Sequence, residues 1–268
     1  MAVDARENCK EIIRNLVPPD LWASNQDLFA QIFHQVKEHP LLSDPVIAAL
    51  GKGEFTPEQL AGAHLEFHYA FAQNFTDALL RAMLLTNRIQ PRLGAAGKVA
   101  ARFLLEFNLL DELGFTPAAP GASGYGGSPV NAHYVKFFET LGQLGIPESH
   151  VAQYTPSPAA ADCHRMVEAA GDDLIATLTI LAVEETIFES FATPWASNMR
   201  QRTTVDTEHG YHAIHVEQDG ELLDDEHAED LWYVLQAALT PDRYDDVRRI
   251  TASSLDTVHR FVRSLANA

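Results

Sequence analysis

Apolar residues recur at helical spacing along almost the whole chain, and no stretch of useful length alternates as a half-buried strand would. Thr56 and Pro57 are the residue types of a helix N-cap and first helical position. The apolar pattern that follows them runs to about Leu85 and predicts one uninterrupted helix. The periodicity therefore predicts an all-α protein.

The rest of the chain divides into segments of the same kind. Further helices are predicted at residues 27–39, 93–113, 130–145, 158–168, 172–199, 226–238 and 242–265. Residues 116–131 are rich in Pro, Gly, Ala and Ser and predict a long loop, which we interpret as a lid or pocket wall. No change in composition calls for a second core, so the expectation is a single domain over residues 1–268, a bundle of about seven to nine helices.

Charge and cysteine content exclude several kinds of protein. The formal net charge is −18, which repels phosphate backbones and anionic lipid, so neither nucleic acid nor a membrane is expected as a partner. No apolar run approaches the roughly 20 residues that cross a bilayer, and the N-terminal residues are too polar for a signal peptide. Cys9 and Cys163 are too few for a disulfide framework, which favours a reducing, cytoplasmic location.

Glu112 is the first residue that does not suit a core position. It shares a helical face with Leu105 and Leu109, which predicts an inward direction. An ionised carboxylate that is buried without a partner costs several kcal/mol. The alternative is that Glu112 lies near the helix end and reaches solvent past Gly114.

Glu184 is a stronger case. It lies on an apolar helical face formed by Ile180, Leu181, Ile187, Phe188 and Phe191. Its neighbour Glu185 is predicted to point in a wetter direction. A glutamate on so apolar a face needs a cation, either a metal ion or an arginine such as Arg102 in a buried ion pair.

A third cluster of polar residues lies in residues 208–227. His215 and Asp219 are four residues apart, and Asp224 and His227 are three apart, so each pair shares a face if its segment is helical. Such pairs could bind a metal from one side, or they could form a solvated acidic turn. Two inward carboxylates and a His/Asp cluster provide nitrogen and oxygen ligands without thiolate, which favours iron or manganese over structural zinc. Helical bundles with inward Glu and His pairs are a known framework for two irons.

At these positions the chain resembles the haem-oxygenase-like di-iron oxidases and oxygenases. Their superfamily also contains thiaminase-like proteins and pyrroloquinoline-quinone synthase. Glu112 with Gly114 after it, and His133 at the start of the next helix, resemble the first two ligand positions of that family. The resemblance covers about residues 28–240.

The later ligand positions resemble the family less completely. Glu184 matches the third ligand, and Tyr211 with His215 and then Asp219 matches the following motif. The family would next have a histidine where this chain has Leu222. Asp224 and His227 come five residues late, a rotation of about 140° on a helix, so an unbroken helix could not present both His215 and His227 to one site.

The resemblance implies two ferrous ions per chain. The implied ligands are Glu112, His133, Glu184, His215, His227 and one of Asp219 and Asp224. It further implies a dioxygen-dependent reaction on a small metabolite that is amino-acid-like or fatty-acid-like. The reaction would be N-oxygenation, oxidative decarboxylation or C–C cleavage, and the chain could act as a homodimer.

His64 and His68 lie four apart on the predicted helix from Pro57 and are assigned to the substrate pocket, although packed, hydrogen-bonded histidines would show the same spacing. Two alternatives to an iron enzyme stay open. One is a metal-free, thiaminase-like enzyme that relies on cysteine and carboxylate, and for which Cys163 is poorly placed. The other is a helical interaction protein whose buried glutamates pair with arginines.

Overall fold

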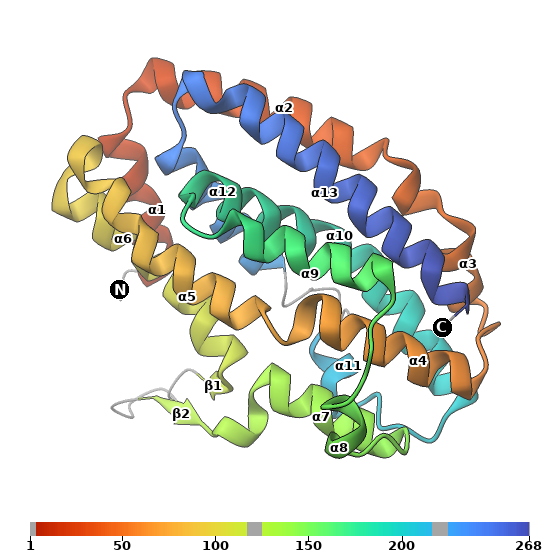
Figure 1. Ribbon diagram of the computed structural model, residues 1–268. Coiled ribbons are helices and arrows are strands. Elements are labelled where there is room, and N and C mark those ends of the chain that lie inside the picture. The colour runs from red at the N-terminus through yellow and green to blue at the C-terminus, as the bar shows by residue number, and fades with distance from the viewer. Residues whose placement is uncertain (1–3, 117–124, 216–224, 268) are drawn as a thin grey trace.

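The computed structural model describes residues 4–116, 125–215 and 225–267, and it confirms the all-α fold class. Thirteen α-helices make up most of the described residues (Figure 1). They are α1 (Ala5–Leu16), α2 (Pro19–Lys37), α3 (Pro45–Gly51), α4 (Pro57–Phe67), α5 (Phe75–Leu85), α6 (Gln90–Glu112), α7 (His133–Gln143), α8 (Glu148–Val151), α9 (Pro158–Ala170), α10 (Leu174–Arg202), α11 (Tyr211–Ile214), α12 (Asp225–Ala238) and α13 (Tyr244–Ser264). Two short strands, β1 (Phe115–Thr116) and β2 (Gly126–Gly127), pair antiparallel.

Side chains at the helix N-termini explain where several helices begin. At α4, the Gln59 amide donates to the Thr56 hydroxyl (3.3 Å) while the Thr56 amide donates to the Gln59 side chain (3.0 Å). This reciprocal capping box satisfies two amides that the helix itself leaves unpaired. At the start of α10, the Asp173 carboxylate accepts hydrogen bonds from the amides of Ile175 and Ala176.

The uninterrupted helix predicted from Pro57 to Leu85 is wrong. The helix changes to a π-helical turn at His68–Ala72 and then breaks before α5 begins. The turn is fixed from outside the helix, because the His164 ring contacts the Tyr69 carbonyl (3.1 Å) and the Gln73 side chain (3.3 Å). The helical spacing of apolar residues continues through the break, so this spacing in the sequence did not reveal that the helix is interrupted. Turns of this type occur often at functional sites.

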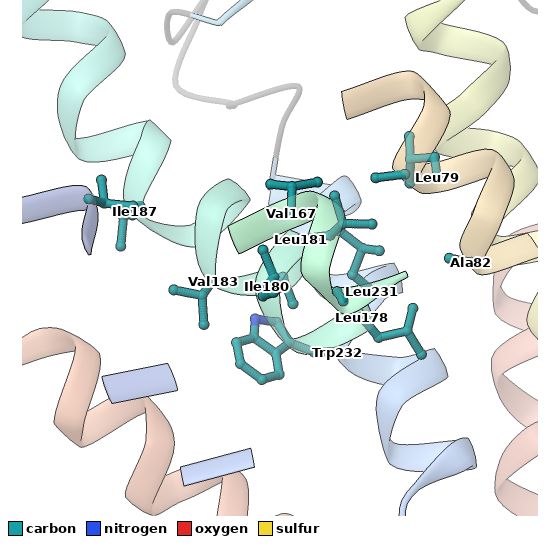
Figure 2. Close-up of a cluster of buried hydrophobic side chains, with 14 of the residues drawn as sticks. Leu79, Ala82, Val167, Leu178, Ile180, Leu181, Val183, Ile187, Leu231 and Trp232 are labelled. Atoms are coloured by element: carbon teal, nitrogen blue, oxygen red, sulfur yellow. The ribbon is translucent and has the colours of Figure 1, made fainter. Parts of the chain in front are cut away.

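The core is built around α10, which contacts α3, α4, α5, α9, α11, α12 and α13. Figure 2 shows apolar side chains from three of these neighbours gathered around α10. The labelled side chains are Leu178, Ile180, Leu181, Val183 and Ile187 of α10, Leu79 and Ala82 of α5, Val167 of α9, and Leu231 and Trp232 of α12. In Figure 1, α2 and α13 run side by side along one flank, and α7 and α11 lie at the other.

Within the described ranges, no helix combines the length and the apolar character that crossing a membrane requires.

Candidate active site

A cavity that opens to solvent lies against α10. Two thirds of its lining side chains are apolar, and they come from α3, α4, α5, α7, α10, α13, the π-helical turn and the 3₁₀ turn at Pro40–Ser43. The polar lining groups are three glutamates, two histidines and two tyrosines, namely Glu112, Glu184, Glu185, His133, His215, Tyr134 and Tyr211. Four of the predicted metal ligands therefore face one cavity.

Glu112 and His133 form a direct pair. Glu112 is 9% exposed at the end of α6, so it does not reach solvent past the helix end. Its Oε1 lies 2.9 Å from Nδ1 of His133, the first residue of α7. Burial by itself raises the pKa of the Glu112 carboxyl, but the imidazoles of His133, His227 and His215 outweigh it and hold the pKa below its usual value.

The turn after α6 returns the chain to His133. Gly114 has φ +79°, and a Cβ at this position would lie 2.5 Å from the amide nitrogen of Ala132. Only glycine fits this combination of backbone angle and close approach. The Ser128 amide donates to the Gly114 carbonyl (3.0 Å), which closes the turn. Residues 117–124 lie outside the described part, so a lid formed by residues 116–131 stays a prediction.

Glu184 is buried in the middle of α10, with 8% of its surface exposed. Among the residues that the structure describes, none donates a hydrogen bond to its Oε1 atom. Burial raises the pKa of the Glu184 carboxyl to about 8. The alternative of a buried ion pair with Arg102 is not realised, because the Arg102 Nε donates to the Met83 carbonyl (3.1 Å) and the Thr86 hydroxyl (3.2 Å).

The expected wetter direction of Glu185 is wrong. Glu185 is 7% exposed and lines the same cavity as Glu184. Adjacent helical residues point about 100° apart, which predicts different surroundings for the two glutamates, but the cavity is broad enough to be lined by both. The spacing on an isolated helix could not show that α10 has neighbours on both sides of this position.

His215 directly follows α11, and Tyr211 begins that helix. The His215 ring lies 5.2 Å from the His133 ring and 5.0 Å from the Phe188 ring, between centroids. His227 lies on α12, a separate helix, so the phase difference expected for an unbroken helix does not apply. Asp219 and Asp224 lie outside the described residues, so their roles stay predictions.

The structure adds one carboxylate that the sequence analysis missed. The Asp111 Oδ2 atom lies 3.4 Å from Nε2 of His227 and 3.6 Å from Nε2 of His133. Asp111 therefore bridges two predicted ligands from different helices. Its position next to Glu112 was the available signal, but helical spacing alone directs it away from the Glu112 face.

His64 is completely buried beside the cavity rather than in its lining. Its Nδ1 donates to the Leu60 carbonyl (2.6 Å), so in the neutral ring Nε2 accepts from His212 Nε2 at 3.0 Å. Burial lowers the pKa of His64 to about 4, consistent with a neutral ring. These contacts favour the packed alternative for His64 over a substrate contact. The pair joins α4 to α11, the helix that leads into His215.

His68, in the π-helical turn, is also close to the cavity without being part of the described lining. Its Nε2 lies 3.2 Å from the hydroxyl of Tyr134, which does line the cavity, and the two rings stack. Burial lowers the pKa of His68 to about 4. A substrate role for His68 stays a prediction, and Tyr134 is the residue through which it could act.

Cys163 is completely buried on α9 and is not part of the described cavity lining. Burial, with a smaller effect of Glu184, raises the pKa of its thiol strongly. A thiol held in its protonated form is a poor nucleophile. The described geometry thus gives Cys163 no role in the cavity.

The described side chains include the kinds of donor atom that bind metal ions, but they do not form a complete coordination site. In residues 4–116, 125–215 and 225–267, no three His, Cys, Asp or Glu side chains surround a common point at which a metal ion could be held. The nearest approach is the Glu112–His133 pair with Asp111 and His227 beside it. Nitrogen and oxygen donors of this kind are those that iron and manganese accept.

Solved structures that are similar to this chain identify its fold. No family model matches the sequence, and no curated protein matches it. Two crystal structures of a CADD-like protein of unknown function from Nostoc punctiforme are similar, each 15% identical, with TM-scores of 0.63 and 0.61. They cover 91% of this chain, which in turn covers 95% and 98% of theirs.

A TenA homologue from P. horikoshii is also similar, at 13% identity and a TM-score of 0.51, over 91% of this chain and 97% of that one. At such identities the likeness shows the fold and not the activity. The chain therefore has the helical fold of the CADD-like and TenA structures.

Proposed function

We propose that this protein is a non-haem di-iron enzyme that uses dioxygen to oxidise a small metabolite. Two irons would be held by a set of buried carboxylates and imidazoles from α6, α7, α10, α12 and the end of α11. These are Glu112, His133, Glu184, His215 and His227, with one of Asp219 and Asp224. Asp111 joins this set as a further candidate because of its contacts with both His133 and His227.

The state of Glu184 is the observation that carries the proposal. Its carboxyl is buried, faces the cavity, and has an oxygen with no hydrogen-bond donor among the described residues. A buried carboxylate without a partner costs several kcal/mol, and a bound cation would remove that cost. The cavity that Glu184 lines also contains Glu112, His133 and His215, so four potential donors share one space.

Bound ferrous iron would supply dioxygen binding and electron transfer to it. The chain provides the surroundings. The aromatic and aliphatic walls make most of the cavity surface apolar, which strengthens electrostatic interactions beside them. The His64–His212 hydrogen bond holds α11 against α4 and thereby positions Tyr211 and His215. The Glu112–His133 contact fixes the orientation of the His133 ring.

A metal-free enzyme of the same fold is the second candidate. A buried carboxyl in a largely apolar cavity, such as that of Glu184, is suited to act as a general acid or base without any metal. Unlike the cysteine-dependent enzyme considered from the sequence, this candidate would use a carboxyl without a cysteine, because Cys163 is buried outside the described lining.

Metal analysis separates the two candidates. The protein is stripped with a chelator, titrated anaerobically with ferrous iron, and assayed for bound iron per chain, with manganese and zinc in parallel. Two irons per chain and a transient visible absorption on mixing with dioxygen support the di-iron proposal. No stoichiometric iron binding, together with activity that survives chelation, would overturn it in favour of the metal-free enzyme. Oxygen-consumption screening of the ferrous protein with amines, amino acids and fatty acids then identifies the substrate.

A further inference from the structure

The cavity has a polar end, which is formed by the lining glutamates and histidines, and a row of aromatic side chains leads away from it. We call this row the aromatic path. From His215, ring contacts run to Phe188 (5.0 Å), then to Phe67 (5.4 Å), Phe71 (5.4 Å) and Phe261 (5.4 Å), between centroids. All five residues line the cavity. Four successive ring contacts connect the imidazole end to α13, so the apolar part is elongated rather than a small patch around the polar groups.

The far end of this path is entirely aliphatic and aromatic. Val258, Phe261 and Val262 of α13 line it, together with Leu41, Leu42 and Ile47. These residues come from α13, α3 and the 3₁₀ turn at Pro40–Ser43, which contact one another. A polar substrate group placed here would lose its hydrogen bonds to water without replacement. The far end therefore fits only a hydrocarbon.

The near end is polar, and its ionisable side chains are mainly glutamates and histidines. Three glutamates line the cavity, and none of the lining residues that the structure describes is a lysine or an arginine. Glu185 is among these glutamates, is 7% exposed, and is not needed for the proposed ligand set. An anionic substrate head would find no lysine or arginine among the described lining residues to pair with, whereas an ammonium group could donate hydrogen bonds to a glutamate oxygen.

We propose that the cavity binds an amine with an extended hydrocarbon tail, with the ammonium group beside Glu185 and the tail along the aromatic path to Phe261. This inference rests on the proposed function in taking the cavity as the substrate site of an enzyme. It does not depend on iron, because the phenylalanines of the path and Glu185 lie outside the proposed ligand set.

The test measures binding to the chelator-stripped protein by calorimetry, using butylamine, hexylamine, octylamine and decylamine below the concentrations at which they aggregate. We expect the dissociation constant to fall about fourfold for each added methylene until the tail fills the path. Decanoate, which has a similar tail and the opposite charge, is expected to bind at least about tenfold more weakly than decylamine. Equal binding of butylamine and decylamine, or decanoate binding as tightly as decylamine, would overturn the proposal.

Variants locate the two ends of the ligand. Val258→Phe and Val262→Phe narrow the far end and are expected to weaken decylamine binding about tenfold or more, with butylamine unchanged. Val99→Phe on the exposed side of α6 is the matched control and should change neither. Glu185→Gln should reduce the preference for decylamine over decanol. Circular dichroism checks that each variant is folded, and the chain-length series on the unaltered protein tests the proposal without any variant.

Iron content, measured on the same preparations, keeps this inference separate from the proposed function. Iron bound stoichiometrically with no chain-length dependence would refute the amine inference alone. Chain-length-dependent amine binding without iron uptake would refute the di-iron proposal and leave the inference standing.

Discussion

Glu66 on α4 and Glu184 on α10 are both buried glutamates, 5% and 8% exposed, on helices that contact each other. Their surroundings are opposite. The Glu66 carboxylate accepts hydrogen bonds from the Tyr154 hydroxyl and from the amide (2.9 Å) and hydroxyl of Ser157. The Glu184 Oε1 atom has no donor within the described part of the chain.

The comparison shows that burial alone does not mark a functional carboxylate. Glu66 has its full set of donors within the chain and fastens the segment before α9 to α4, so its role is structural. Glu184 lines a cavity and leaves an acceptor unused by the described residues, which supports the ligand role that we propose for it. The following predictions test this division.

Glu184→Gln should have the largest effect on function. Loss of the charged ligand is expected to weaken binding of iron at that position on the order of a thousandfold, because removing one partner of a buried charge pair costs several kcal/mol. The metal-free variant should be as stable as the unaltered protein or more stable, since a neutral amide replaces a carboxyl whose ionisation burial opposes. Iron titration and thermal unfolding measure the two effects. Unchanged iron uptake would show that Glu184 is not a ligand.

Acid should destabilise the protein through its buried histidines. Burial lowers the folded-state pKa of His64 from 6.5 to about 4, so the unfolded chain binds more protons between these values. Its contribution to stability is complete above pH 6.5 and declines as the pH falls toward 4, by about 3 kcal/mol in total. Denaturant unfolding across this range measures the loss. His64→Gln should flatten the pH dependence, and a profile as steep as before would contradict a neutral, buried His64.

Glu66→Gln should lower the free energy of unfolding by about 1–3 kcal/mol, because charge-assisted hydrogen bonds to Tyr154 and Ser157 become weaker or mismatched. Iron uptake should not change. Glu54→Gln, an exposed position just before α4, is the matched control for stability. Loss of iron binding in the folded Glu66→Gln protein would contradict the purely structural role assigned to Glu66.

Asp111→Asn should have the smallest effect. Its carboxylate contacts His133 and His227, so its loss is expected to weaken iron binding about tenfold through poorer orientation of the two rings. Glu106→Gln, on the same helix, serves as control. An effect on iron binding as large as that of Glu184→Gln would show that Asp111 binds the metal directly.

Helical periodicity and capping residues were enough to predict the all-α class and most helix positions. Asp173 caps α10 close to the predicted start, and Thr56 and Pro57 begin α4 as expected. The break between α4 and α5 could not be predicted, because the His164 contacts that fix it come from a helix distant in sequence. The inward directions predicted for Glu112 and Glu184 are confirmed, and the direction of Glu185 was wrong.

The sequence by itself determined which helical faces are apolar and which carboxylates interrupt them, because both follow from a local period of 3.6 residues. Only the tertiary structure decided which of these carboxylates have partners. Glu66 obtains its donors from Tyr154 and Ser157, about ninety residues away along the chain. Asp111 reaches His227 across a still longer interval. Such pairings depend on how helices pack against one another, and packing brings together residues whose separation in sequence contains no information about their distance.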